Sequence, residues 1–253
     1  MVDICIESWA AIAPGLETKQ DWGQWLQQSR SLSDGFSKQA FKPIPPMLRR
    51  RLSTLGRCAV SSALMILDKE DSIPSIFSSK YGDTGISLSL LAEMGRGEAM
   101  SPTDFSLAVH NAVGGLFSIV RKDTSKLTSI CATEGLVVNS LLEAVGQLQD
   151  EDRVLCVIYD IPLPELYQRY CDSDAFPYAI AMILNKTAAE QVNIQQVLHV
   201  DQVNTGQTIE HTQLSEPLQL INMLLGFSDE ISTESKGITW KLTRTVSDDV
   251  KQT

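Results

Sequence analysis

Short apolar runs separated by segments of helical spacing constrain the fold of this chain more than any other feature. Each run is rich in Val, Ile, Leu and Ala, which is typical of strands that are buried on both faces. Between the runs at residues 127–132 and 154–160, apolar residues recur three and four positions apart from Glu134 to Leu148, which predicts a helix. Alternating strands and helices predict an α/β layer fold with a largely buried sheet. The four runs are residues 127–132, 154–160, 176–184 and 197–200.

Further elements follow from the same patterns. Ser101 is a good helix N-cap, and Pro102 suits the first helical position. Gly114 and Gly115 then mark either the end of that helix or a place where another backbone comes close. The remaining expected elements are strands at residues 2–12, 76–77 and 237–246 and helices at residues 48–66 and 217–227, with a short helix beginning near Leu88.

Composition narrows the classes of function. Lys and Arg number 21 against 31 Asp and Glu, a net charge of −10, which argues against nucleic-acid binding because phosphate contacts need clustered basic side chains. The chain begins without a signal-peptide pattern, and no apolar run reaches the ~18–20 residues of a membrane span. Five widely spaced cysteines without a CxxC pair predict reduced thiols in a cytoplasm, and indicate neither a disulfide framework nor a zinc site.

Cys131 is the sharpest candidate for a nucleophile. It follows a predicted strand and precedes a predicted helix, and the dipole at a helix N-terminus favours a thiolate. The alternative is a small core residue at the end of a strand, since free cysteines are among the most buried residue types. Scattered acids near turns are typical of solvated side chains rather than of a metal cluster; they are Asp83, Glu93, Glu98 and Asp104.

Cysteine-dependent acyl chemistry usually needs a histidine as well. The chain has three: His110 in a predicted helix, His199 in a β run and His211 in a polar loop. None lies in a glycine-rich turn of the kind that fixes a catalytic imidazole. The pattern therefore argues against a complete catalytic triad.

Several segments, in order, resemble the N-terminal half of β-ketoacyl-acyl-carrier-protein synthases. The resemblance covers about residues 1–190 and is most specific over residues 101–145. The chain is similar to a stand-alone ketoacyl-synthase-like N-terminal family whose members are chain length factors, notably of aryl polyene biosynthesis. The matching segments are PPMLRRRLSTLGRCAVSSAL, YGDTG, SPTDFSLAVHNAVGGLFSI, LTSICATEGLVVNSLLEA and DAFPYAIAMIL.

This resemblance implies a thiolase-like α/β fold with a mixed, mostly buried sheet and helices packed on it. It implies one domain over residues 1–253, in which residues 191–253 complete the domain in a way atypical of the family. A synthase of this superfamily takes its nucleophilic cysteine from its first half and two catalytic histidines from glycine-rich motifs in its second. Neither histidine motif occurs here, so the resemblance implies no condensation by this chain alone, and no cofactor or metal.

The nucleophile position itself is in question. Aligning Gly135 with the glycine three residues after a synthase nucleophile places the vestigial nucleophile at Ala132. Cys131 would then point to the other face of the strand, because side chains alternate. A shift of one residue in the alignment makes Cys131 the nucleophile position instead.

Synthases dimerise through their N-terminal halves, and the acyl tunnel of one subunit ends against the other. The resemblance therefore implies a non-catalytic, chain-length-factor-like subunit that pairs with a full-length synthase, meets acyl carrier protein through that complex and helps shape its tunnel. Tyr81 and Phe105 fall near the tunnel end, with plain core packing as their alternative role. Asn111, Glu134 and Val138 are expected at the partner interface.

Two other functions stay open. One is an independent acyltransferase or thioesterase that uses Cys131. The other is a homodimeric module that binds acyl chains or carrier protein. Reactivity of the thiol near neutral pH favours the first, and a well-behaved homodimer of the chain alone favours the second.

Overall fold

A computed structural model describes residues 2–28, 32–186, 196–203 and 214–245. The described strands form one eight-stranded sheet in the order β3-β2-β4-β5-β1-β6-β8-β7. β2 runs parallel to β3 and β4, and all other neighbours are antiparallel, so the sheet is mixed, as expected. The strands are β1 (Val2–Ile12), β2 (Ser75–Ser78), β3 (Leu127–Ile130), β4 (Arg153–Asp160), β5 (Tyr178–Asn185), β6 (Gln196–Val203), β7 (Glu230–Ser235) and β8 (Ile238–Thr245).

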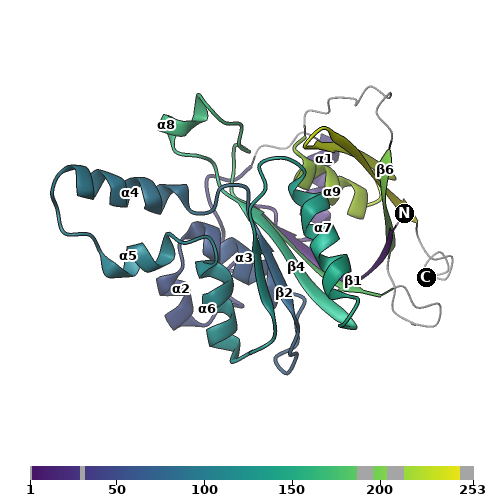
Figure 1. Ribbon diagram of the computed structural model, residues 1–253, viewed down its shortest axis with the longest axis horizontal. Helices are drawn as coiled ribbons and strands as arrows, with labels where there is room; N and C mark the ends of the chain where they lie inside the picture. Colours follow the sequence, from purple (N-terminus) through teal and green to yellow (C-terminus); the bar gives the residue numbers. More distant parts are fainter. Residues whose placement is uncertain (1, 29–31, 187–195, 204–213, 246–253) are drawn as a thin grey trace.

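Helices pack on both faces of this sheet, and Figure 1 shows the two layers. α7 and α9, with Trp22 of α1, build a core on one face, while α3 and α6 build a second core on the other. The helices are α1 (Lys19–Gln28), α2 (Pro46–Arg51), α3 (Thr54–Leu64), α4 (Thr84–Gly95), α5 (Pro102–Leu107), α6 (Ala112–Arg121), α7 (Leu136–Gln147), α8 (Glu165–Gln168) and α9 (Glu216–Leu224).

β4 shows why the apolar runs lack a polar face. Successive side chains of a strand point to opposite faces of the sheet. Val154, Cys156 and Ile158 pack in the core beneath α7, whereas Leu155 and Val157 pack in the core beneath α3. A strand covered by helices on both faces needs apolar residues at every position, which explains the continuous run seen in the sequence.

β1 lies in the middle of the sheet and contains a register shift between Ile6 and Ser8. Ile4 and Ile6 face the same core as Trp9 and Ala11, so the shift moves the alternation by one residue and keeps these apolar side chains on the α7 face. Glu7 sits at this shift. It accepts hydrogen bonds from the Arg153 guanidinium at 2.7 and 2.9 Å, which ties β1 to β4 across β5.

The helix predicted for residues 48–66 is divided into two. Leu52 is extended, and the hydroxyl of Ser53 accepts a hydrogen bond from the Gly56 N–H, which starts α3 as a new helix. The prediction of one continuous helix is wrong because apolar spacing continues across a capped break. The short β7 strand and the single turn of α8 were also not predicted.

The segment that begins at Ser101 also forms two helices, α5 and α6. Gly114 lies inside α6, where a Cβ would meet a Leu127 methyl at 2.9 Å and the Phe77 ring at 3.2 Å. A helix end at Gly114 is therefore wrong, and the groups that come close to it are side chains rather than another backbone. Gly115 has nothing within 4 Å of such a Cβ.

Residues 84–109, which we call the arm, carry α4 and α5 away from the body of the protein (Figure 1). α4 buries only Leu90, and α5 buries no residue. Four large apolar side chains of the arm are about half exposed or more: Leu91 at 57%, Met94 at 57%, Phe105 at 61% and Val109 at 49%. The arm therefore presents apolar surface that the described part of this chain does not cover. None of the described helices is long and apolar enough to cross a membrane.

Candidate functional site

The turn between β3 and α7, residues 131–135, is where the sequence predicted a nucleophile, and we call it the nucleophile turn. Cys131 is exposed, and its thiol donates to the carbonyl oxygen of Lys80 at 3.2 Å. Ala132 is partly buried and packs against the core on the α7 face of the sheet. The two side chains have different surroundings, although both residues lie in the turn beyond the end of β3.

The N-terminus of α7 is occupied by a carboxylate from another part of the chain. Gly135 adopts a left-handed conformation with φ 60° and supplies no side-chain cap. Glu216, in the first turn of α9, instead accepts hydrogen bonds from the N–H groups of Val137 and Val138, each at 3.3 Å. Burial raises the pKa of Glu216, although these N–H groups act in the opposite direction. The free donors that would favour an anion at this helix end are therefore already paired.

The β7–β8 turn lies against the same segment. The Lys236 N–H donates to the Glu134 carboxylate at 3.2 Å, and the side-chain amide of Asn139 donates to the Ser235 hydroxyl at 3.4 Å. A Cβ on Gly135 would meet the Ser235 Cβ at 2.7 Å, so this position requires glycine for space as well as for its φ angle. Two elements from beyond residue 213 thus cover the nucleophile turn.

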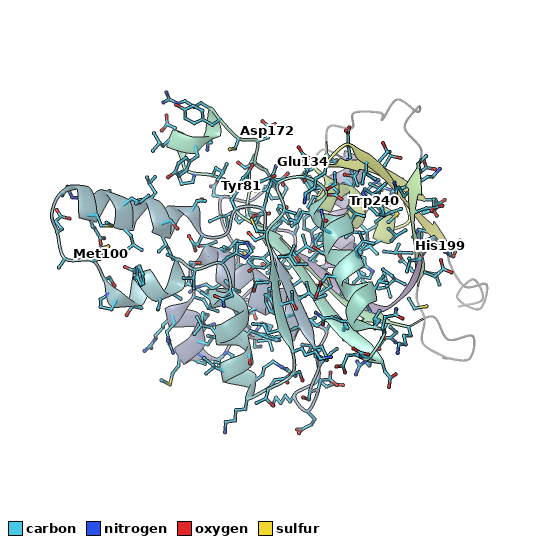
Figure 2. All side chains as sticks on the ribbon, in the orientation of Figure 1. Tyr81, Met100, Glu134, Asp172, His199 and Trp240 are labelled. Carbon is cyan, nitrogen blue, oxygen red and sulfur yellow. The ribbon has the colours of Figure 1, made fainter. Side chains whose placement is uncertain are left out.

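A cavity of about 430 Å³ adjoins the N-terminus of α7. Tyr81 lines it and donates from its phenol to the Asp172 carbonyl at 3.4 Å. Figure 2 shows Tyr81, Glu134 and Asp172 at this end of the molecule. Carboxylates dominate the lining, with Lys80 as the only cation among the lining residues. The acidic residues of the lining are Glu134, Asp160, Asp172, Asp174, Glu216 and Glu234.

Asp160 ends β4 and lines the same cavity. Its carboxylate accepts from the Ser79 hydroxyl at 2.8 Å and from the Lys80 N–H at 2.9 Å. Burial raises the pKa of Asp160 to about 6, against the effect of these donors. Burial also raises the pKa of Tyr81 to about 12 and the pKa of Asp174. Asp160 therefore fixes the turn that carries Tyr81.

The structure brings one histidine near the thiol. His110 lies in the turn between α5 and α6, not in a helix as predicted, and its Nε2 is 3.1 Å from the Ser79 carbonyl oxygen. With Cys131 and Asn111 it lines a shallow hollow on the surface. His199 instead pairs with Asp3 at 2.6 Å at a distant surface, labelled in Figure 2. His211 lies outside the described residues.

The expected tunnel and interface residues have different surroundings. Tyr81 is half-buried at the cavity, whereas Phe105 is on the arm and does not line it. Core packing is therefore wrong as the alternative role of Phe105. Asn111 and Glu134 are exposed. Val138 is fully buried in this chain's own core, so it has no side-chain surface for a partner, and its assignment to the interface is wrong.

Sequence reasoning missed Glu216 and Asp160. Glu216 follows Ser215 and precedes Pro217, which is a helix-start signal with an acid in the first turn, but nothing local shows which helix it caps. Asp160 is the one acid at the end of an apolar strand, and that contrast could have drawn attention to it. No group of three or more metal-ligating side chains occurs among the described residues.

The chain has a mixed sheet between two helical layers, with a strand–turn–helix unit beside a cavity, and solved structures similar to it in fold include thiolase-like ketosynthases. The chain belongs to the family described as beta-ketoacyl synthase, N-terminal domain, whose model matches residues 22–242. No curated protein matches the sequence.

Among solved structures, the chain is similar to a complex of a ketosynthase (ApeO) with its chain length factor (ApeC) from Xenorhabdus doucetiae. That match has 25% identity and a TM-score of 0.78, and it covers 96% of this chain and 100% of the other. The ishigamide ketosynthase/chain length factor matches with 9% identity and a TM-score of 0.64, over 79% of this chain and 67% of the other. A beta-ketoacyl synthase from Burkholderia phymatum matches with 9% identity and a TM-score of 0.58, over 90% of this chain and 71% of the other. The last two matches show the fold alone.

Proposed function

We propose that this chain is a non-catalytic, chain-length-factor-like subunit. It forms a heterodimer with a full-length β-ketoacyl-acyl-carrier-protein synthase and helps shape that enzyme's acyl tunnel during decarboxylative condensation in polyene biosynthesis, of the aryl polyene type. The observation that carries the proposal is the match to a complex of a ketosynthase with its chain length factor. It spans 96% of this chain and the whole of the matched chain, so the matched chain is about as short as this one.

The nucleophile turn supports a non-catalytic role. Ala132 offers a methyl group where the alignment expects a thiol, and Cys131 hydrogen-bonds a backbone carbonyl from an exposed position. Glu216 pairs the N–H groups of α7 that would stabilise a thiolate. The partner would therefore supply the cysteine and the histidines of the reaction.

Two exposed features support an interface with a large partner. The arm presents the apolar side chains of Leu91, Met94, Phe105 and Val109, and β3 is an edge strand of the described sheet. An edge strand carries unpaired N–H and C=O groups that a second chain can meet. Obligate interfaces commonly bury ~2,000 Å² or more, and apolar surface of this kind contributes to them. Asn111 and Glu134, both exposed near β3, belong to the same proposed surface.

We propose that residues 1–253 form a single domain. β6, β8 and β7 extend the same sheet beyond β1, and residues of α9 share a core with α7 and β4.

The net negative charge of this chain disfavours direct docking of acyl carrier proteins, because these proteins are acidic themselves. The partner would therefore bind the carrier protein, and the complex would work in the cytoplasm. The half-buried Tyr81 and the exposed Phe105 would then contact the growing chain at the end of the tunnel.

Co-expression tests the proposal. The full chain is produced with a tagged full-length ketosynthase, and a second culture produces each protein alone. A one-to-one complex that extends acyl chains from malonyl- and acyl-carrier protein, with no product from this chain alone, is the expected result. A monodisperse chain with no affinity for the ketosynthase contradicts it.

One observation favours a second candidate, an acyltransferase or thioesterase that uses Cys131. The thiol and His110 line the same hollow. Both groups hydrogen-bond carbonyl oxygens of neighbouring residues, Lys80 and Ser79, and not each other. Acyl transfer by the chain alone that is lost in Cys131→Ala would favour this candidate. A stable homodimer of the chain alone would favour an acyl-binding module.

A further inference from the structure

The segment from α9 to β8 makes three contacts at one place, the start of α7. Glu216 of α9 accepts from Val137 and Val138. The Lys236 N–H in the β7–β8 turn donates to Glu134. Ser235 stands 2.7 Å from the position of a Cβ on Gly135. No other element of the described chain pairs the first N–H groups of α7 through a side chain.

The Glu216 carboxylate is chemically suited to this place. The N-terminus of a 12-residue helix carries partial positive charge and unpaired N–H donors, and it stabilises an anion. Gly135 has no side chain to pair them, so the sequence around α7 does not cap its own helix. An anion must come from elsewhere, and here it is a side chain of the same polypeptide.

We infer that Glu216 is a built-in carboxylate ligand that fills the anion site at the start of α7, and that the segment from α9 to β8 thereby closes the vestigial reaction centre. This role is independent of any partner. It gives residues 214–245 a function that the resemblance to synthases did not supply. It also means that restoring a cysteine at Ala132 is not sufficient to restore an activated thiol.

The pairing of the α7 N–H groups with Glu216 explains why a cysteine at position 132 would not be activated. A thiol is activated when nearby positive charge favours its thiolate. At this turn the positive end of α7 is already paired with the carboxylate of Glu216. A thiolate at position 132 would therefore gain less stabilisation from the start of α7, and the negative charge of Glu216 would disfavour it.

The test measures thiol alkylation in the full chain, produced with its ketosynthase if required. Ala132→Cys is treated with iodoacetamide at pH 7, and peptide mass spectrometry separates position 132 from Cys131. We expect a rate no greater than that of an unstructured cysteine peptide. Adding Glu216→Gln should raise the rate about tenfold, a one-unit fall in thiol pKa. Glu234→Gln is the matched control, because Glu234 is an exposed acid that lines the same cavity, and it should leave the rate unchanged.

Each outcome decides the inference. If Ala132→Cys alone reacts faster than the free peptide, α7 still activates an anion there and the inference is wrong. That single variant suffices even where Glu216→Gln does not fold. If Glu216→Gln and Glu234→Gln change the alkylation rate equally, the inference is also wrong, because the rate would then depend on the net charge of the cavity and not on the bonds of Glu216 to α7. As a second readout, Glu216→Ala should regain thermal stability with millimolar formate, relative to chloride at equal ionic strength, and Glu234→Ala should not.

Discussion

The thiol of Cys131 donates a hydrogen bond to the carbonyl oxygen of Lys80 at 3.2 Å. This contact joins the nucleophile turn to the turn that Asp160 anchors, so the thiol links two loops at one edge of the sheet. The contact therefore supports a structural role for the one exposed cysteine of the chain's described residues.

We expect Cys131→Ala to leave condensation by the complex with a ketosynthase unchanged within about twofold. The chain alone should give no β-ketoacyl product, because its sequence contains neither of the histidine motifs that a synthase uses. Product formation is measured by mass spectrometry of the acyl carrier protein. Turnover by the isolated chain that disappears with Cys131→Ala would contradict the proposed function.

Tyr81 and Phe105 test control of product length. If either ring closes the partner's tunnel, its truncation to alanine should lengthen products by one extension cycle, since each added methylene gains ~0.8 kcal/mol of burial. Phe105→Ala should cost the fold less than about 0.5 kcal/mol because the ring is exposed. Met65→Ala, an exposed residue beyond α3, is the control. Wild-type lengths from both ring variants would exclude these residues from the tunnel.

The arm should be required for assembly. Leu91→Glu and Met94→Glu place charges on exposed apolar positions of α4, and they should weaken the complex at least tenfold while leaving thermal unfolding of the free chain unchanged. Met65→Glu should affect neither property. Dissociation constants are measured by titration of labelled chain against ketosynthase. Unchanged affinity in both arm variants would remove α4 from the interface.

The raised pKa of Asp160 predicts how the stability of the fold changes with pH. Its folded pKa of about 6 exceeds the ordinary 3.8, so between these values the folded state binds a proton that the unfolded state lacks. The free energy of unfolding should therefore decrease as pH rises from 4 to 6, and the raised pKa values of Asp174 and Glu216 act in the same direction. Asp160→Asn should reduce this decrease by about 1–3 kcal/mol in urea titrations. Glu70→Gln, at an exposed acid, should leave the slope as in wild type.

The glycine pair of α6 gives a matched test of packing. Gly114→Ala should destabilise the chain by about 1–3 kcal/mol, because its Cβ would overlap Leu127 and Phe77. Gly115→Ala should stabilise it by about 0.5–1 kcal/mol, since alanine favours the helix and the space is empty. Both are measured by thermal unfolding. Equal effects of the two substitutions would contradict this packing of α6 against β2 and β3.

The sequence predicted the sheet better than the site, and particular residues show why. The strands at residues 154–160 and 176–184 were predicted nearly in full because burial on both faces leaves a continuous apolar run. Glu216 was missed because its role depends on a contact with Val137, 79 residues earlier in the chain, which no local pattern encodes. Val138 was misassigned for a related reason, since spacing alone does not tell which face of α7 meets the sheet.

The position of β1 has a consequence for synthesis of the chain. β1 is made before β5 and β6, yet Trp9 lies opposite Met182 and Asp3 lies opposite His199. While the ribosome makes the intervening residues, an apolar strand has no native neighbour, and pairing over so long a separation is slow. Unpaired apolar strands at this stage are prone to aggregation. The interval between translation of β1 and translation of β6 is therefore the period in which a cell must protect this chain from misassembly.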